Sequence, residues 1–181
     1  MTKMILLMRH AEAQNAEGIQ RDFGRRLTAE GCETASQVGT CLNAANIVCD
    51  RILTSSADRT LQTAEIVAQH FCPSAILVPL ESLYNSSART LLSTMIRECE
   101  ADDSCVMVVA HNPGIAELMC QLADKSLSVP PGMLAAVHAE ISDWSELANA
   151  DVNNVRLVAV IQDGSVAWQD PGFNGPISPK G

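Results

Sequence analysis

The chain contains few aromatic residues and few basic ones. Its 181 residues include two Trp, one Tyr and three Phe, and 12 Lys and Arg stand against 21 Asp and Glu, a net charge of −9. A nucleic-acid-binding protein needs a basic face with aromatic rings, and an anionic membrane surface attracts clustered Lys and Arg. The composition therefore argues against nucleic acid and against a membrane surface as partners.

Three further signals are missing. The seven cysteines are odd in number and form no Cys-x-x-Cys pair, which favours neither a disulfide framework nor a cysteine-bound metal. No stretch approaches the ~20 apolar residues of a membrane-spanning helix, and the apolar run at residues 4–8 is too short for a signal peptide. We therefore expect a reduced, cytoplasmic protein that needs no metal ion and no cofactor.

Positive charge gathers near the N-terminus. Residues 1–60 hold seven basic and seven acidic residues, whereas the remaining 121 hold five basic and 14 acidic ones and carry the whole net charge. Nine of the 12 basic residues are Arg, whose planar guanidinium matches phosphate and carboxylate groups. This asymmetry is compatible with a local anion pocket and also with arginines scattered over a solvated surface.

Short apolar runs alternate with helical patterns along the chain. Strands are predicted at residues 4–8, 51–54, 75–78, 105–110, 134–141 and 155–161. Helical spacing of apolar residues follows the N-cap Thr28, recurs at 61–71 and 91–99, and follows Asn112 and Pro113, a natural N-cap and first helical residue. The alternation predicts a single α/β domain over residues 1–170, with three layers (α/β/α) and a largely parallel sheet. Residues 171–181 are predicted to form a flexible C-terminal tail.

Polar side chains follow three of the predicted strands. Arg9 and His10 come after the first, Arg59 lies a few residues after the second, and His111 follows the strand at 105–110. Ligands of such sheets bind outside the carboxyl ends of the strands, so one crevice could hold all four side chains. A histidine or arginine of this kind is usually a solvated or satisfied polar residue when taken alone. Their joint placement favours a site for a phosphoryl group, with neutral imidazole as nucleophile and guanidinium groups on the oxygens.

Three motifs carry a resemblance to a known family. Residues 7–11 (LMRHA), 54–64 (TSSADRTLQTA) and 109–114 (VAHNPG) resemble, in order, the opening Arg-His motif, the phosphate-binding arginine motif and the second-histidine motif of the histidine phosphatase superfamily, which has the phosphoglycerate-mutase-like fold. The likeness spans most of residues 3–123. It implies that His10 is the nucleophile that becomes phosphorylated, and that Arg9, Arg59 and His111 bind the phosphoryl oxygens.

Within this superfamily the chain most resembles the SixA-like protein-histidine phosphatases. The compact length fits that branch, and so does the segment at residues 22–28 (DFGRRLT), which resembles its Asp-Phe-x-Arg-Pro-Leu-Thr pattern. Arg25 falls on the arginine of that pattern and is a further candidate ligand of the substrate.

One departure from the superfamily bears on the substrate. Many of its phosphomonoesterases and mutases carry a proton-donating Glu or Asp where this chain has Asn85, which cannot donate a catalytic proton. Glu81 and Glu12 are nearby alternatives, and Asn85 itself is predicted to contact the substrate. An alkoxide, with a conjugate-acid pKa of roughly 15, needs an acid in order to leave, whereas imidazole, with a pKa of ~6.5, leaves more easily. The departure therefore favours phosphohistidine as substrate.

The sequence thus predicts a metal-independent phosphatase that works through a phosphohistidine on the enzyme and dephosphorylates phosphohistidine on a signalling protein. Two alternatives stay open. The chain could be a phosphatase of the same superfamily that acts on small phosphorylated molecules with an unrecognised acid. It could also be a phosphate-binding module without turnover.

Overall fold

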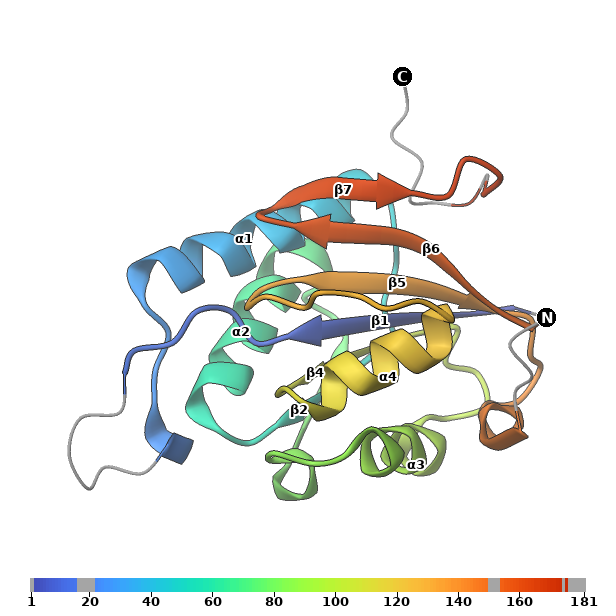
Figure 1. The fold of residues 1–181 in the computed structure, drawn as a ribbon, viewed down its shortest axis with the longest axis horizontal. Helices are drawn as coiled ribbons and strands as arrows, with labels where there is room; N and C mark the ends of the chain where they lie inside the picture. The colour runs from blue at the N-terminus through green and yellow to red at the C-terminus, as the bar shows by residue number, and fades with distance from the viewer. Residues whose placement is uncertain (1, 16–21, 150–153, 174, 176–181) are drawn as a thin grey trace.

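A computed structural model describes residues 2–15, 22–149, 154–173 and 175. Within them, seven strands form one sheet: β1 (Lys3–Arg9), β2 (Arg51–Ser55), β3 (Ile76–Leu80), β4 (Cys105–Ala110), β5 (Leu134–Ala139), β6 (Val155–Gln162) and β7 (Ser165–Gln169). The helices of the described chain are α1 (Ala29–Ala44), α2 (Asp58–Phe71), α3 (Ala88–Glu98) and α4 (Gly114–Ala123), with short 3-10 turns η1 (Asp22–Gly24), η2 (Glu81–Leu83) and η3 (Trp144–Asn149). Figure 1 shows their arrangement.

The strands follow the order β3-β2-β4-β1-β5-β6-β7. β3, β2, β4 and β1 pair in parallel, whereas β5, β6 and β7 continue the sheet from β1 with antiparallel pairing. The sheet is therefore mixed. The predicted parallel arrangement holds for β3, β2, β4 and β1 and does not hold for β5, β6 and β7. The α/β fold class is confirmed, and β7 is a strand that the sequence patterns did not predict.

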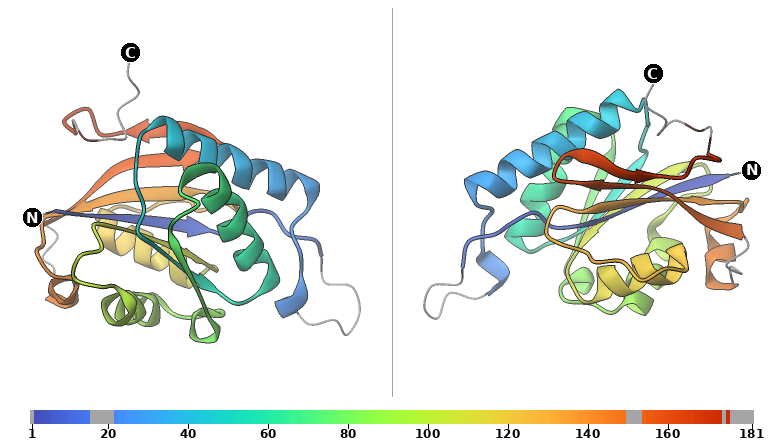
Figure 2. Two further views of the ribbon diagram at one scale, coloured as in Figure 1. Left: turned by 180° about the vertical axis from the view of Figure 1, so that it is seen from behind. Right: turned by 45° about the horizontal axis from the view of Figure 1, so that its top comes forward.

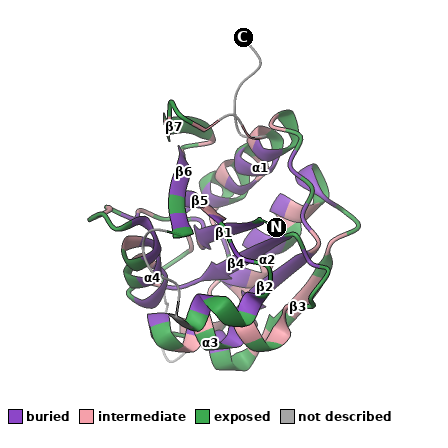
Figure 3. Cartoon of the chain, turned by 90° about the vertical axis from the view of Figure 1, so that its right-hand side faces the viewer, coloured by how far each residue is buried: buried purple, intermediate pink, exposed green. Residues whose placement is uncertain are grey.

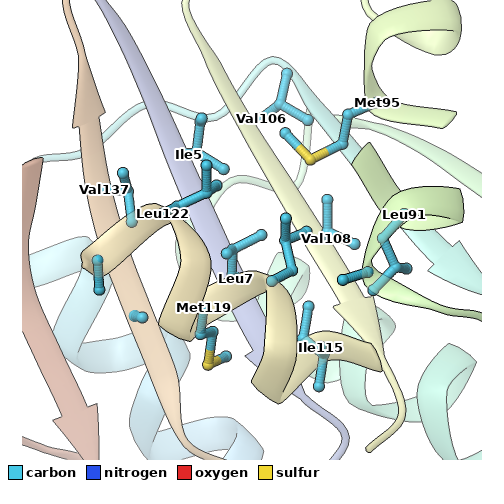
Figure 4. Close-up of a cluster of buried hydrophobic side chains, with 14 of the residues drawn as sticks. Ile5, Leu7, Leu91, Met95, Val106, Val108, Ile115, Met119, Leu122 and Val137 are labelled. Atoms are coloured by element: carbon cyan, nitrogen blue, oxygen red, sulfur yellow. The ribbon is translucent and has the colours of Figure 1, made fainter. Parts of the chain in front are cut away.

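Helices cover both faces of the sheet and complete the predicted three layers (Figures 1 and 2). Side chains of β1 alternate between the faces: Ile5 and Leu7 pack in the cluster that includes α3 and α4, and Met4, Leu6 and Met8 pack in the cluster that includes α1 and α2. Figure 4 shows the first cluster, with the side chains of α4 lying over β1 and β4. Central strands buried on both faces read as continuous apolar runs, which explains why residues 4–8 and 105–110 were recognisable. Figure 3 shows that the strands in the middle of the sheet are buried, whereas the helices have exposed residues on their outer faces.

The predicted N-cap residue is confirmed for α1 and is wrong for α4. The Thr28 hydroxyl accepts the N–H of Gly31 at 2.9 Å and caps α1, as predicted. At α4 the helix begins at Gly114, and Pro113 occupies the cap position without a side-chain hydrogen bond. The prediction that Asn112 caps this helix is wrong: the helix begins two residues later, the amide nitrogen of Asn112 donates to the carbonyl oxygen of Val129 at 3.2 Å, and its amide oxygen has no hydrogen-bond partner among the described residues.

The C-terminal prediction falls partly on residues outside the described chain. Positions 174 and 176–181 are not described. Phe173, within the predicted tail, packs against His138 with ring centroids 5.4 Å apart. The division into a domain at 1–170 and a tail at 171–181 therefore stays a prediction. Among the described residues, no helix is long and apolar enough to cross a membrane.

Candidate active site

The polar residues predicted for the site converge because three adjacent parallel strands end together. Arg9 is the last residue of β1 and His10 follows it, Ser55 ends β2, and His111 follows β4. β2, β4 and β1 are neighbours in the sheet, and Arg59 is the second residue of α2, the helix after β2. β1 runs toward the left in Figure 1, where the chain continues to η1.

A cavity of about 460 Å³ lies at this edge of the sheet. It is lined by Arg9, His10, Glu12, Ala13, Asp22, Arg25, Arg59, Asn85, His111, Asn112 and Pro131. All six residues predicted to contact substrate are in this lining, as is Glu12, one of the two alternative acids. The other, Glu81, is an exposed residue of η2 and is not part of the lining.

His10 is buried and its imidazole is fixed by one backbone hydrogen bond. Its Nδ1 lies 2.8 Å from the carbonyl oxygen of Ala11, which can only accept, so Nδ1 carries the proton. The lone pair is then on Nε2, where the Arg59 Nε–H donates at 3.3 Å. Nε2 is therefore the nucleophilic atom, and it can attack a substrate once the Arg59 Nε–H releases its lone pair.

Both histidines are held in the neutral form. Burial lowers the pKa of His10 to about 4, and the positive charges of Arg59, Arg9 and Arg25 act in the same direction against the bond to Ala11. Burial, followed by the charge of Arg59, lowers the pKa of His111 to about 3. At neutral pH the His10 imidazole is thus available as a nucleophile.

A serine fixes the orientation of His111. The Nε2 of His111 lies 2.9 Å from Ser55 Oγ, which also accepts the N–H of Ala57 at 3.3 Å. When the Ser55 hydroxyl donates its proton to Nε2, the imidazole proton of His111 is on Nδ1. That Nδ1 is buried and has no hydrogen-bond partner among the described residues. In this tautomer Nδ1 is a hydrogen-bond donor that lacks an acceptor among the described residues.

The arginines supply further donors. Arg59 is 3% exposed and uses one N–H on His10, one on the Asp22 carbonyl oxygen and one on Asp22 Oδ2, at 2.8 Å for the last. A guanidinium has five N–H groups, so two of them have no partner in the part of the chain that the structure describes. Arg9 donates to Val129 O at 2.9 Å, and its buried Nε has no partner in the described part of the chain. These donors suit a group with several oxygens, such as a phosphoryl group.

Asp22 is the member of the cavity that sequence reasoning missed. Its Oδ1 accepts from Arg25 Nη1 at 3.0 Å, and its Oδ2 accepts from Arg59 and, at 2.7 Å, from the hydroxyl of Tyr84. Partial burial alone would raise the pKa of the Asp22 carboxyl, but the hydrogen bonds from Tyr84 and Arg25 and the charge of Arg59 hold that pKa well below its usual range. The segment at residues 22–28 was the available signal, although it pointed only to Arg25.

The described residues include no cluster of three or more His, Cys, Asp and Glu side chains arranged to hold a metal ion. The cavity instead combines a neutral nucleophile, His10 Nε2, with guanidinium and imidazole donors. That combination suits transfer of a phosphoryl group to a histidine.

Residues 5–82 match the family described as "Histidine phosphatase superfamily (branch 1)". This part of the chain, somewhat less than half of its length, is similar to that superfamily. The matched range contains Arg9, His10, Arg25 and Arg59, whereas His111 lies beyond it and is brought to the same cavity by β4.

Solved structures extend the likeness over most of the chain. A candidate phosphohistidine phosphatase SixA from Nakamurella multipartitia is 26% identical, with a TM-score of 0.77, and the match covers 89% of this chain and 96% of that one. The protein histidine phosphatase SixA in complex with tungstate has a TM-score of 0.72 over 88% of this chain and 97% of its own, at 20% identity, which shows a common fold.

An uncharacterized chloroplastic protein of Arabidopsis thaliana is 26% identical over 155 residues, which is 80% of this chain and 70% of that protein. The family match and the likeness to solved phosphatases support a phosphatase as the enzyme class of this chain.

Proposed function

We propose that the protein hydrolyses phosphohistidine on a partner protein through a phosphorylated His10. The observation that carries the substrate class is Asn85, an amide in the cavity lining at the position where the related phosphomonoesterases carry an acid. The likeness to a candidate phosphohistidine phosphatase of 26% identity supports the same substrate class.

The first step is in-line attack of His10 Nε2 on phosphorus. The bond between Nε2 and phosphorus forms while the bond between phosphorus and the substrate imidazole breaks, and its electron pair stays on the departing nitrogen. The proton on His10 Nδ1 stays in its bond to Ala11 O. Arg9, Arg59 and His111 Nδ1 bind the phosphoryl oxygens, where charge is spread in the transition state.

The second step is attack of water on phospho-His10. The bond to Nε2 breaks, neutral His10 is regenerated, and the proton of the water passes to the phosphate product or to solvent. No group has to protonate Nε2, because neutral imidazole with its proton on Nδ1 is a sufficient leaving group.

Hydrolysis of alkyl phosphates is the second candidate, because one carboxyl group in the cavity has not been assigned. Glu12 is part of the lining, and one of its oxygens accepts from the Thr28 hydroxyl at 3.0 Å. If Glu12 protonated a leaving oxygen, the preferred substrates would be phosphomonoesters. A phosphate-binding module without turnover is the third reading, and it predicts no covalent intermediate.

Trapping the intermediate tests the proposal. Incubation with a ³²P-phosphohistidine phosphotransfer protein, followed by an alkaline quench, is expected to leave label on the wild-type chain and none on His10→Ala. His70→Ala is the matched control, because His70 is exposed and hydrogen-bonds to Ser36, outside the cavity. Label obtained only from alkyl phosphates would favour the phosphomonoesterase, and binding of the phosphoprotein without any label would favour the binding module.

A further inference from the structure

We propose that Asp22 is a substrate-binding residue that accepts the ring N–H of the departing phosphohistidine, an inference that rests on the proposed function. Its role is to hold the leaving imidazole in the protonated form from which phosphorus is lost most readily. Asp22 would thereby make the site selective for phosphoramidates of imidazole over phosphate esters.

The chemistry of the leaving group creates the need for such a residue. Phosphohistidine has phosphorus on one ring nitrogen, and its second nitrogen is either protonated or free. When the second nitrogen carries a proton, breakage of the bond to phosphorus releases neutral imidazole. When it does not, the bond must release an imidazolate anion, a far poorer leaving group. A carboxylate that accepts the N–H stabilises the positively charged ring and so favours the reactive form.

Asp22 has the capacity to accept that hydrogen bond. Among the described residues, its Oδ2 accepts two hydrogen bonds, from Arg59 and Tyr84, whereas its Oδ1 accepts one, from Arg25. Each carboxylate oxygen can accept about two hydrogen bonds, so Oδ1 can take another without release of Arg59. Arg59 in turn keeps two N–H groups for the phosphoryl oxygens, so both roles can coexist.

The position of Asp22 suits the leaving side of the reaction. His10 and Arg59 are buried, at 8% and 3% exposed, whereas the Asp22 side chain is 43% exposed and lines the same cavity. In-line displacement places the leaving group on the side of phosphorus opposite to His10. Because Asp22 is far more exposed than His10, its position fits a leaving imidazole that departs away from the buried nucleophile.

The contacts around Asp22 keep it ionised and fixed. Arg25, Arg59 and the Tyr84 hydroxyl hold it from separate segments, and the pKa of its carboxyl stays well below the usual range, so it accepts hydrogen bonds and does not act as a general acid. The Tyr84 ring is itself held edge-on between Phe23 and His111, with centroids 5.0 and 5.3 Å away.

The enzyme treats its own histidine in the same way. In phospho-His10 the second ring nitrogen, Nδ1, keeps its proton in the bond to Ala11 O. Asp22 would do for the substrate ring in the first step what Ala11 does for His10 in the second. Each step then releases a neutral imidazole, and neither step needs a proton donor at Asn85.

A comparison of two substrates, one with a ring N–H on its leaving group and one without, distinguishes substrate binding by Asp22 from a purely structural role. Asp22→Asn is expected to lower kcat/KM for a phosphohistidine phosphotransfer protein by about 10- to 100-fold, the usual effect of losing a hydrogen bond to a charged group. The rate on p-nitrophenyl phosphate, whose leaving group has no N–H, should change by less than about threefold. In this variant the amide oxygen is expected to face Arg59 and Tyr84, so that the amide nitrogen takes the place of Oδ1, where it can accept neither from the substrate nor from Arg25.

Glu12→Gln is the matched control, because Glu12 is the other carboxylate of the lining and has no arginine partner among the described residues. It should affect the two substrates equally. Tyr84→Phe keeps the carboxylate and removes one of its anchors, so a smaller but still selective loss on phosphohistidine is expected. This second variant decides the question if circular dichroism shows that Asp22→Asn does not fold.

The outcomes that overturn the inference are distinct from those that overturn the proposed function. Equal losses on both substrates would show that Asp22 acts only by holding Arg59, and no loss on either would remove Asp22 from the reaction. A selective loss in Glu12→Gln alone would transfer the role to Glu12. If the wild-type chain hydrolyses p-nitrophenyl phosphate and not phosphohistidine, the proposed function fails and this inference fails with it.

Discussion

At the scale of single residues, Asn85 lines the cavity, and the proposed function assigns to it the choice of leaving groups. Its backbone has φ 47°, in the left-handed region that Asn and Asp tolerate better than other residues with side chains. Asp can therefore replace Asn85 without a change in the backbone. Position 85 therefore lies in the cavity lining and can carry an acidic side chain.

Asn85→Asp should add the missing proton donor. The rate on an alkyl phosphate such as glycerol phosphate is expected to rise at least about tenfold, since positioned general acids commonly contribute 10²- to 10⁴-fold. The rate on phosphohistidine should change little. Steady-state kinetics on both substrates checks this, with Asn85→Gly as the control that keeps the positive φ and adds no acid. An equal rise in both variants would show that the acid is not the cause.

Sequence patterns predicted the residues of the cavity that belong to local motifs, and they missed the one defined by contacts. Arg9, His10, Arg59 and His111 each follow a recognisable strand or begin a helix. The contacts of Asp22 come from Arg59, 37 positions away, and from Tyr84, 62 positions away. No local pattern records such distances along the chain, so the role of Asp22 became visible only in three dimensions.

At the scale of elements, the start of α4 is fitted tightly against the segment before α3. A Cβ atom at Gly114 would lie 1.9 Å from the carbonyl oxygen of Ser86, far inside van der Waals contact. Ser86 follows Asn85, and Gly114 comes shortly after His111. The close approach therefore sets the distance between two sides of the cavity.

Gly114→Ala should force these two segments apart. Overpacking of a tight contact usually costs about 1–3 kcal/mol of unfolding free energy. The urea midpoint is expected to fall, together with the rate on phosphohistidine, because Asn85 and His111 are displaced. Gly24→Ala is the control for stability, since a Cβ there meets no atom within 4 Å. Equal stability of the two variants would contradict the argument.

The elements that sequence reasoning missed or misjudged have physical explanations. β7 is largely exposed and therefore lacks the apolar run that marked β1 and β4. The turn before β7 does have a sequence signal, since Asp-Gly is typical of a two-residue hairpin turn. In the structure Asp163 and Gly164 both have positive φ, as such a turn requires. At α4 the predicted cap residue lies one position too early: Pro113 holds the cap position, and the side-chain oxygen of Asn112 bonds to none of the described residues.

At the scale of the whole molecule, the net charge of −9 and the cationic cavity are separate features. The guanidinium groups of Arg9, Arg25 and Arg59 line one cavity, and each has a fixed partner nearby. An acidic surface repels extended polyanions, whereas one phosphoryl group presented by a protein can enter the cavity. Composition alone described the surface and could not reveal this site.

The two buried histidines make the stability of the whole chain depend on pH. The folded-state pKa values of His10 and His111, about 4 and about 3, lie below the ~6.5 of an unfolded histidine. Between these limits the unfolded chain binds more protons, so acidification favours unfolding. The pKa of the Asp22 carboxyl is also lowered, but its contribution is lost only below about pH 4. The range from pH 7 to 4.5 therefore isolates the histidines.

Urea unfolding at pH 7 and pH 4.5 should show this linkage. Each histidine is expected to account for a loss of about 2–3 kcal/mol of unfolding free energy over that range, at about 1.4 kcal/mol per pKa unit. His10→Ala removes one contribution, so its loss between the two pH values should be smaller by that amount. The exposed His70 provides the matched control, and His70→Ala should keep the full wild-type loss. If His10→Ala lost as much stability as the wild type on acidification, His10 would not be held neutral by burial, and its assignment as a ready nucleophile at neutral pH would need another cause.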